Sequence, residues 1–261
     1  MLHILRAVAI AAIYNRFAAA QADNQCGNAT LALSAGKRNV LLVGDSISMA
    51  MPYTPGGYGT ALRELLESEG VAVQHAGGFY AGGQCSNTIK GLLCTNASTP
   101  DSYVVIPGGG QFDLIHFNYG LHDLVAACVP PATGECEEHV DIGGPYGRNI
   151  IELYRRFHTI SKLVMWVSTT PVPNVTTSMG RTYELAVAYN EEARNSLAGY
   201  LAPAPLLIND LWTAFIGVCG AGYKNCTLQL PKNVHLSAAG IQFAAKTSAA
   251  AIMAALASLR A

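Results

Sequence analysis

Charge is scarce in this sequence. Charged residues occupy 13% of the 261 positions, and 16 basic against 17 acidic side chains leave a formal net charge of −1. No basic stripe is present, which argues against nucleic acid as a partner. Apolar runs of membrane-spanning length are missing too, because the longest candidate, residues 243–259, contains Lys246 and small polar residues. We therefore expect no membrane span, and we expect this segment to be a terminal helix packed on the sheet.

Signatures of cofactors and metals are also missing. The glycines of residues 76–83 lack the spacing of a dinucleotide-binding fingerprint, and glycines 108–110 are not followed by the Lys-Ser/Thr of a phosphate loop. Cys128, Cys136 and His139 form a candidate metal cluster, but they lack the paired Cys-x-x-Cys spacing of structural zinc. We expect no cofactor and no metal.

Short apolar runs alternate with helical periodicities along most of the chain. This alternation predicts an α/β fold: a single-domain, three-layer α/β/α architecture around a five-stranded, mostly parallel, flavodoxin-like sheet. Neither an internal repeat nor a long linker divides residues 23–261, which we therefore predict to be one domain. The predicted strands are residues 39–44, 71–74, 113–118, 163–168 and 206–208. The predicted helices are residues 60–69, 86–93, 148–161 and 181–201, followed by a helix that begins at 236–237.

The tripeptide Gly44-Asp45-Ser46 directly follows the first predicted strand. In an open α/β sheet, ligands bind beyond the carboxyl ends of the strands. A serine at that place can present its hydroxyl to a cleft, with backbone N–H groups around a developing oxyanion. The same tripeptide is ordinary turn chemistry, so its position alone does not establish catalysis.

Two later segments complete a recognisable set. Gly120-Leu121-His122-Asp123 follows the third predicted strand, and Val234-His235-Leu236-Ser237 precedes the last predicted helix. In this order, the three segments resemble the nucleophile block, the Gly-x-Asn-Asp block and the end of the Asp-x-x-His block of the SGNH (GDSL) hydrolases, a family of esterases and lipases. The resemblance runs from about residue 40 to the end of the chain. It implies that Ser46 is the nucleophile and His235 its general base.

The resemblance also implies an oxyanion hole made by Ser46, a glycine after the second strand and residue 122. Gly83 is our first choice for that glycine, and Gly78 is an alternate. His122 stands where the family has asparagine, and an imidazole N–H can make the same donation. Asn118, two residues before Gly120, is an alternate donor.

The third member of the triad departs from the family pattern. The family acid lies three residues before the histidine, and that position is Lys232. We expect either a backbone carbonyl near Lys232 to orient His235, or Asp210, after the fifth strand, to replace the acid. Asp45 and Asp123 are expected to brace their loops by hydrogen bonds near the site.

These residues support three functional hypotheses. The first is a secreted serine esterase whose substrate is a carbohydrate acetyl ester, a lipid or another small-molecule or polysaccharide ester. The second, motivated by His122 and Lys232, is a catalytically degenerate glycan- or lipid-binding protein on the same fold. The third is an acyl transferase that uses the same Ser–His pair.

The N-terminus resembles a secretory signal. An apolar stretch, residues 7–14, follows His3 and Arg6, and Ala20-Gln21-Ala22 supplies small residues for cleavage, so we predict a signal peptide over residues 1–22. An N-terminal helix of the mature protein is the alternative. Four Asn-x-Ser/Thr sequons, which are glycan acceptors in secreted proteins, begin at Asn28, Asn96, Asn174 and Asn225.

The cysteines point to the same compartment. Six of the seven form three pairs that are close in sequence, and in an oxidising compartment each pair could staple a surface loop. Free buried cysteines in a cytosolic protein are the alternative, and the sequons argue against it. Cys26 is left without a predicted partner. The predicted pairs are Cys85 with Cys94, Cys128 with Cys136, and Cys219 with Cys226.

Overall fold

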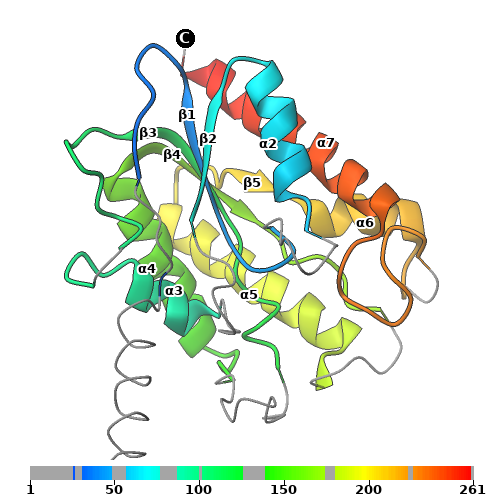
Figure 1. The fold of residues 1–261 in the computed structure, drawn as a ribbon. Coiled ribbons are helices and arrows are strands. Elements are labelled where there is room, and N and C mark those ends of the chain that lie inside the picture. Colours follow the sequence, from blue (N-terminus) through cyan, green and yellow to red (C-terminus); the bar gives the residue numbers. More distant parts are fainter. Residues whose placement is uncertain are drawn as a thin grey trace, which may run out of the picture.

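Five parallel strands form the centre of the computed structural model (Figure 1). The structure describes residue 26 and residues 31–48, 57–76, 87–99, 102–125, 139–173, 180–222 and 226–259. The strands lie in the order β2-β1-β3-β4-β5, and every pair of neighbours is parallel. This confirms the predicted flavodoxin-like sheet. The strands are β1 (Asn39–Val43), β2 (Ala72–Ala76), β3 (Phe112–Phe117), β4 (Ser161–Val167) and β5 (Ile208–Asn209).

Helices cover both faces of this sheet (Figure 1). On one side, α2 (Gly59–Ser68) packs against α7 (Ala238–Ser258), which also contacts α6 (Leu211–Cys219). On the other side, α4 (Pro145–Thr159) lies between α3 (Thr88–Cys94) and α5 (Tyr183–Leu201). The sequence did not predict α6, because its apolar residues are nearly continuous and show no polar face at the helical period.

The two central strands are buried along their whole length. Every residue of β1 and β3 is buried, because helices cover both faces of a parallel sheet. His116 is a polar exception within β3. Burial lowers its pKa to about 3, so the ring is neutral, and Asn209 Nδ2 donates a hydrogen bond of 2.9 Å to its Nε2. The sheet core therefore accepts a histidine because it is uncharged and hydrogen-bonded.

Helix α7 has the length and composition of a membrane span, but in this fold it is a core helix. It contacts α2, β3 and β5, and small residues let it approach closely. A Cβ atom on Gly240 would lie 1.8 Å from the Leu228 carbonyl oxygen, so only glycine fits where the first turn of α7 packs against the loop before it. The contacts with β3 and β5 confirm the predicted terminal helix packed on the sheet.

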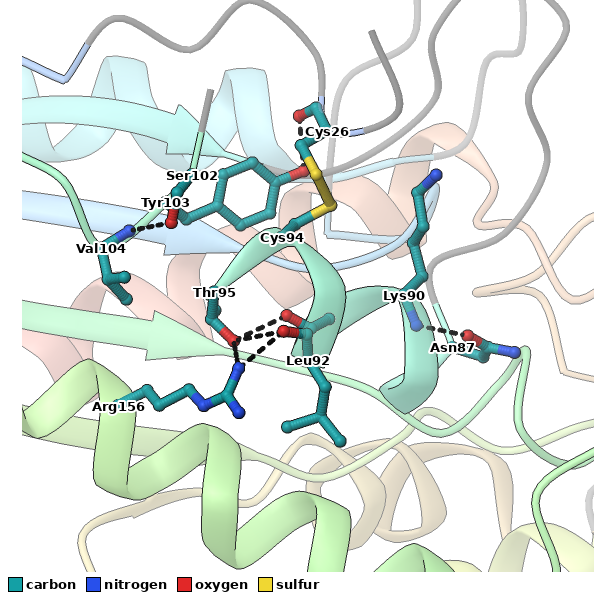
Figure 2. Close-up of a disulfide and its surroundings, with 11 residues drawn as sticks. Cys26, Asn87, Lys90, Leu92, Cys94, Thr95, Ser102, Tyr103, Val104 and Arg156 are labelled. Carbon is teal, nitrogen blue, oxygen red and sulfur yellow. Dashed lines mark hydrogen bonds between the residues drawn. A yellow bond between two sulfur atoms is a disulfide. The ribbon is translucent and has the colours of Figure 1, made fainter. Parts of the chain in front are cut away.

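A disulfide joins Cys26 to Cys94 at the end of α3, with Cα atoms 5.3 Å apart (Figure 2). Tyr103 Oη donates a hydrogen bond of 2.7 Å to the Cys26 carbonyl oxygen beside it. The predicted pairing of Cys94 with Cys85 is therefore wrong, because Cys94 bonds to Cys26, which lies 68 residues earlier in the sequence. Cys85 itself lies outside the described residues.

Helix α3, which carries Cys94, is held at both ends. Asn87 Oδ1 caps its first turn by accepting from the Lys90 N–H at 2.9 Å, and Arg156 Nη1 from α4 donates to the Leu92 carbonyl at 2.6 Å (Figure 2). The disulfide thus anchors Cys26 to a helix that is itself fixed to the rest of the domain. A second disulfide, Cys219–Cys226, closes a short loop after α6, as the spacing predicted. Cys128 and Cys136 lie outside the described residues.

Removing the Cys26–Cys94 bond with the double substitution Cys26→Ala/Cys94→Ala should lower the free energy of unfolding by about 2–4 kcal/mol. The bond spans 68 residues, so its loss frees a long loop in the unfolded chain. Urea denaturation measures the change. The matched control, Cys219→Ala/Cys226→Ala, opens a separation of only 7 residues and should cost less. Equal losses in the two variants would contradict the loop-length argument.

Candidate active site

The chain turns sharply where β1 ends. A Cβ atom on Gly44 would lie 2.6 Å from both Cβ and Oγ of Ser48, so the turn requires glycine at this point. Asp45 is fully buried, and its Oδ1 accepts from the Ile47 N–H at 2.9 Å, which braces the turn. Ser46, which lies between Asp45 and Ile47, is only half-buried. The turn therefore buries its carboxylate and leaves its serine hydroxyl accessible.

His235 lies on a tight loop between α6 and α7. The Leu230 N–H donates to the His235 carbonyl at 2.9 Å, which closes the loop on itself. Gln229 Nε2 donates to the carbonyl oxygens of Val234 at 3.1 Å and of Pro171 at 2.7 Å. Because Pro171 follows β4, these bonds attach the histidine loop to the carboxyl edge of the sheet.

Ser46 and His235 meet at this edge although 189 positions separate them in sequence. Ser46 Oγ lies 3.0 Å from His235 Nε2, within hydrogen-bond distance. Burial lowers the pKa of His235; the Asp45 carboxylate opposes this shift, and the charges of Arg181 and His122 add to it. The imidazole is therefore neutral near pH 7, the form that can accept a proton from a serine hydroxyl.

The other ring nitrogen of His235 faces Asn233, which the sequence analysis did not identify. Nδ1 lies 2.8 Å from Asn233 Oδ1, and the same oxygen accepts from the His235 backbone N–H at 3.0 Å. The orienting group is thus a side-chain amide, and not the backbone carbonyl expected near Lys232. The sequence does place a polar residue, Asn233, two positions before His235, but the family pattern has its acid three positions before the histidine.

Asp210 does not replace the missing acid. Its Oδ1 accepts from the Thr213 N–H at 3.1 Å and caps α6, and it also accepts from Ser168 Oγ at 3.1 Å. Its Oδ2 forms an ion pair of 2.7 Å with Arg194. The carboxylate therefore fixes the start of α6 to the end of β4, a structural role.

Asn118 is likewise engaged elsewhere. Its Nδ2 donates to the Val167 carbonyl at 2.8 Å and, at 3.5 Å, to Thr169 Oγ1, so both amide hydrogens point toward the end of β4. The side chain is buried between the two strands. Asn118 thus links β3 to β4, and its amide hydrogens are not free to donate to an oxyanion.

The loop after β3 carries His122 to the same edge. Gly120 has a φ of +154°, and a Cβ atom there would lie 2.3 Å from Thr169 Oγ1, so the loop packs tightly against the end of β4. Arg181, which precedes α5, donates from Nε to the Leu121 carbonyl at 2.8 Å and fixes the loop. His122 is half-buried, and it lies near enough to lower the pKa of His235.

Asp123 fastens this loop to α3. It is fully buried and accepts from both the N–H of Thr88, at 2.8 Å, and its Oγ1, at 2.5 Å. Burial raises the pKa of Asp123 to about 7, and the two bonds from Thr88 oppose that shift. Asp45 and Asp123 are therefore both placed beneath the edge, where they hold the turns that present Ser46 and His122.

Several predicted residues lie outside the described part of the chain. Whether side chains gather to hold a metal ion can be examined only among the described residues. Within the described part of the chain, no group of three or more His, Cys, Asp or Glu side chains is placed to hold a metal ion. Of the predicted glycan acceptors, only Asn96 is described. Besides Cys85, Cys128 and Cys136, the predicted site residues and glycan acceptors outside the described ranges are Asn28, Gly78, Gly83, Asn174 and Asn225.

Comparison with known proteins identifies the fold. No family profile matches the sequence, and no curated protein matches it. Solved structures do match, among them an acetylxylan esterase from Geobacillus stearothermophilus, with a TM-score of 0.56 and 15% identity over 86% of this chain and 95% of the other. A GDSL-like lipase from Bacteroides thetaiotaomicron gives a TM-score of 0.52 and 13% identity over 94% and 98%. A Slackia heliotrinireducens protein with a provisional SGNH hydrolase description gives 0.52 and 15% over 83% and 100%. The chain has the fold of the SGNH/GDSL hydrolases.

Proposed function

We propose that this protein is a serine esterase of the SGNH type. The observation that carries the proposal is the 3.0 Å distance between Ser46 Oγ and His235 Nε2 at the carboxyl edge of the sheet, where both residues are half-buried. Nucleophile and base within hydrogen-bond reach, with the base held by a third group, is the arrangement that nucleophilic catalysis requires. The fold shared with acetylxylan esterases and a GDSL-like lipase supports the same reaction class.

The reaction proceeds in two halves. Ser46 Oγ attacks the ester carbonyl carbon while His235 Nε2 takes the hydroxyl proton, and a tetrahedral oxyanion forms. His235 then protonates the leaving alcohol, which departs and leaves an acyl group on Ser46. Water attacks this acyl-enzyme while His235 Nε2 takes a proton from it, and a second tetrahedral oxyanion forms. This intermediate collapses, the bond from the acyl carbon to Ser46 Oγ breaks, His235 returns the proton to Ser46 Oγ, and the carboxylic acid is released.

The oxyanion needs N–H donors during both halves. We assign this role to the Ser46 backbone N–H and to His122, whose loop meets the nucleophile turn at the carboxyl edge of the sheet. A glycine of the segment after β2, Gly83 by resemblance, would complete the hole. The substrate we propose is a carbohydrate acetyl ester, a lipid or another small ester, because the fold itself does not choose among them.

The rival hypothesis of a degenerate binding protein gains no support from the geometry. Such a protein would be expected to separate the nucleophile from the base by a bulky side chain. Here the two atoms lie at hydrogen-bond distance, and the nucleophile turn keeps its glycine and its buried carboxylate. An acyl transferase would use the same pair, and competition between water and an added alcohol acceptor distinguishes it from a hydrolase.

We also propose that the protein is secreted and glycosylated. Two disulfides support this proposal, because disulfides form and persist mainly in oxidising compartments. Asn96 is exposed beyond the end of α3, and its Oδ1 accepts from the Ser98 N–H at 3.0 Å, which leaves the amide nitrogen open to modification. The signal peptide over residues 1–22 remains a prediction from the sequence.

Ser46→Ala should lower kcat/KM for p-nitrophenyl acetate by at least about 10³-fold, because nothing else supplies the nucleophile. Steady-state hydrolysis measures the loss, and longer p-nitrophenyl esters establish the preferred acyl chain. The matched control is Ser68→Ala, an exposed serine on α2, which should retain full activity. Equal rates for wild type and Ser46→Ala would refute a nucleophilic Ser46.

His122→Ala should lower kcat by about 10²-fold, and it should raise KM by much less, because an oxyanion donor acts in the transition state. The same esters give both constants. His158→Ala, on the last turn of α4, is the control histidine and should leave both unchanged. An unaltered kcat in His122→Ala would remove this residue from the mechanism.

Expression in a secreting eukaryotic host should give a glycoprotein whose mass falls on digestion with peptide N-glycosidase. Asn96→Gln should remove one glycan, which intact-protein mass spectrometry resolves, because the substitution removes the proposed acceptor amide. The variant should keep its esterase activity. A mass for Asn96→Gln that differs from wild type only by the substitution would show that Asn96 is not modified.

A further inference from the structure

The orientation of the Asn233 amide determines which nitrogen of His235 carries the proton. One Asn233 atom lies 3.0 Å from the His235 backbone N–H and 2.8 Å from its ring Nδ1. A backbone N–H can only donate, so that atom must be the amide oxygen. An amide oxygen can only accept, so Nδ1 must carry a hydrogen. The neutral ring then has its lone pair on Nε2, which faces Ser46 Oγ at 3.0 Å.

The shape of the loop explains why residue 233 reaches the ring. Lys232 has a φ of +54°, a left-handed conformation that a lysine rarely adopts, and it is exposed. The Asn233 N–H donates to the Leu230 carbonyl at 3.1 Å and closes this turn. The reversal places position 233 on the Nδ1 side of His235. An acid at position 232, where the family resemblance puts it, would sit on the strained turn itself.

We propose that Asn233 is the positioning residue of the His235 base and takes the place of the triad acid. This inference rests on the proposed function, because it assumes that His235 acts on Ser46. Asn233 fixes the tautomer and the plane of the ring, as a triad carboxylate does. Unlike a carboxylate, it brings no charge to the imidazolium that forms during the reaction.

The charges that face His235 give this substitution a measurable consequence. The Asp45 carboxylate favours the charged ring, whereas burial, Arg181 and His122 disfavour it, and the pKa of His235 falls below its ordinary value. A carboxylate in contact with Nδ1 would reverse that balance. With Asn233 in that place the base remains neutral, and therefore competent, in mildly acidic solution. The acid limb of the pH–rate profile should accordingly lie below the ordinary histidine pKa of about 6.5.

Three variants test the assignment against p-nitrophenyl acetate, with acetate release measured from pH 4 to pH 9. Asn233→Ala should lower kcat about tenfold, with little change in KM, because the ring loses its hydrogen bond and its fixed tautomer. Asn233→Asp should move the acid limb upward by about one pH unit or more, because an adjacent carboxylate stabilises the imidazolium. Lys232→Asn removes the neighbouring cation, keeps a residue that tolerates the left-handed turn, and should behave as wild type.

A second readout does not depend on activity. Nitrogen-15 NMR of the full-length protein should show His235 with its proton on Nδ1 in the wild type, and a mixture of the two tautomers in Asn233→Ala. If Ser46→Ala kept wild-type activity, the proposed function would fail, yet the NMR result would still decide whether Asn233 fixes the ring. Thermal denaturation confirms that each variant is folded.

The assignment has two clear ways to fail. An Asn233→Ala protein with the wild-type pH profile, kcat and tautomer would overturn it, as would an Asn233→Asp protein with an unmoved acid limb. Restoration of activity by Lys232→Asp in the Asn233→Ala background would return the orienting role to the position that the family resemblance predicts. We expect no such restoration, because position 232 lies on the outer side of the turn.

Discussion

Parallel pairing of β1, β3 and β4 places three carboxyl strand ends at one edge of the sheet, and the whole candidate site depends on that edge. The end of β1 supplies Ser46, and the end of β3 leads to His122. The end of β4 supplies no reacting group, but its Pro171 carbonyl accepts the bond from Gln229 that fixes the loop of His235. Because these strands pair in parallel, the segments that follow them lie close together although they are far apart in sequence.

The site separates its carboxylates from its reacting atoms. Asp45 and Asp123 are both fully buried, and each accepts backbone N–H groups that fix a turn. The groups that approach the proposed nucleophile and base are instead neutral or basic, namely the His122 imidazole, the Asn233 amide and the nearby Arg181. This arrangement keeps His235 uncharged and ready to act as a base, while it gives the imidazolium less stabilisation than a carboxylate in contact with the ring would.

Short-range patterns were sufficient wherever structure follows from neighbours in sequence. The apolar runs predicted all five strands, because strands that helices cover on both faces are mostly apolar. The same reasoning missed α6, whose nearly continuous apolar residues hide the helical period. It also paired Cys94 with the nearest cysteine, whereas the fold brings Cys26 to it across 68 residues. The sequence also offered Asp210 as a candidate acid, whereas the structure shows its carboxylate bonded to Thr213 and Arg194.

The sequence by itself determined the order of the strands and of every helix except α6, the glycine that permits the turn after β1, and the choice of Ser46 and His235 as candidate nucleophile and base. These depend on residue types within a few positions of each other. Only the tertiary structure decided that Ser46 and His235 touch, and that Asn233 holds the ring. Those outcomes depend on where β1 and β4 end in space and on a left-handed turn at Lys232, which no spacing rule encodes.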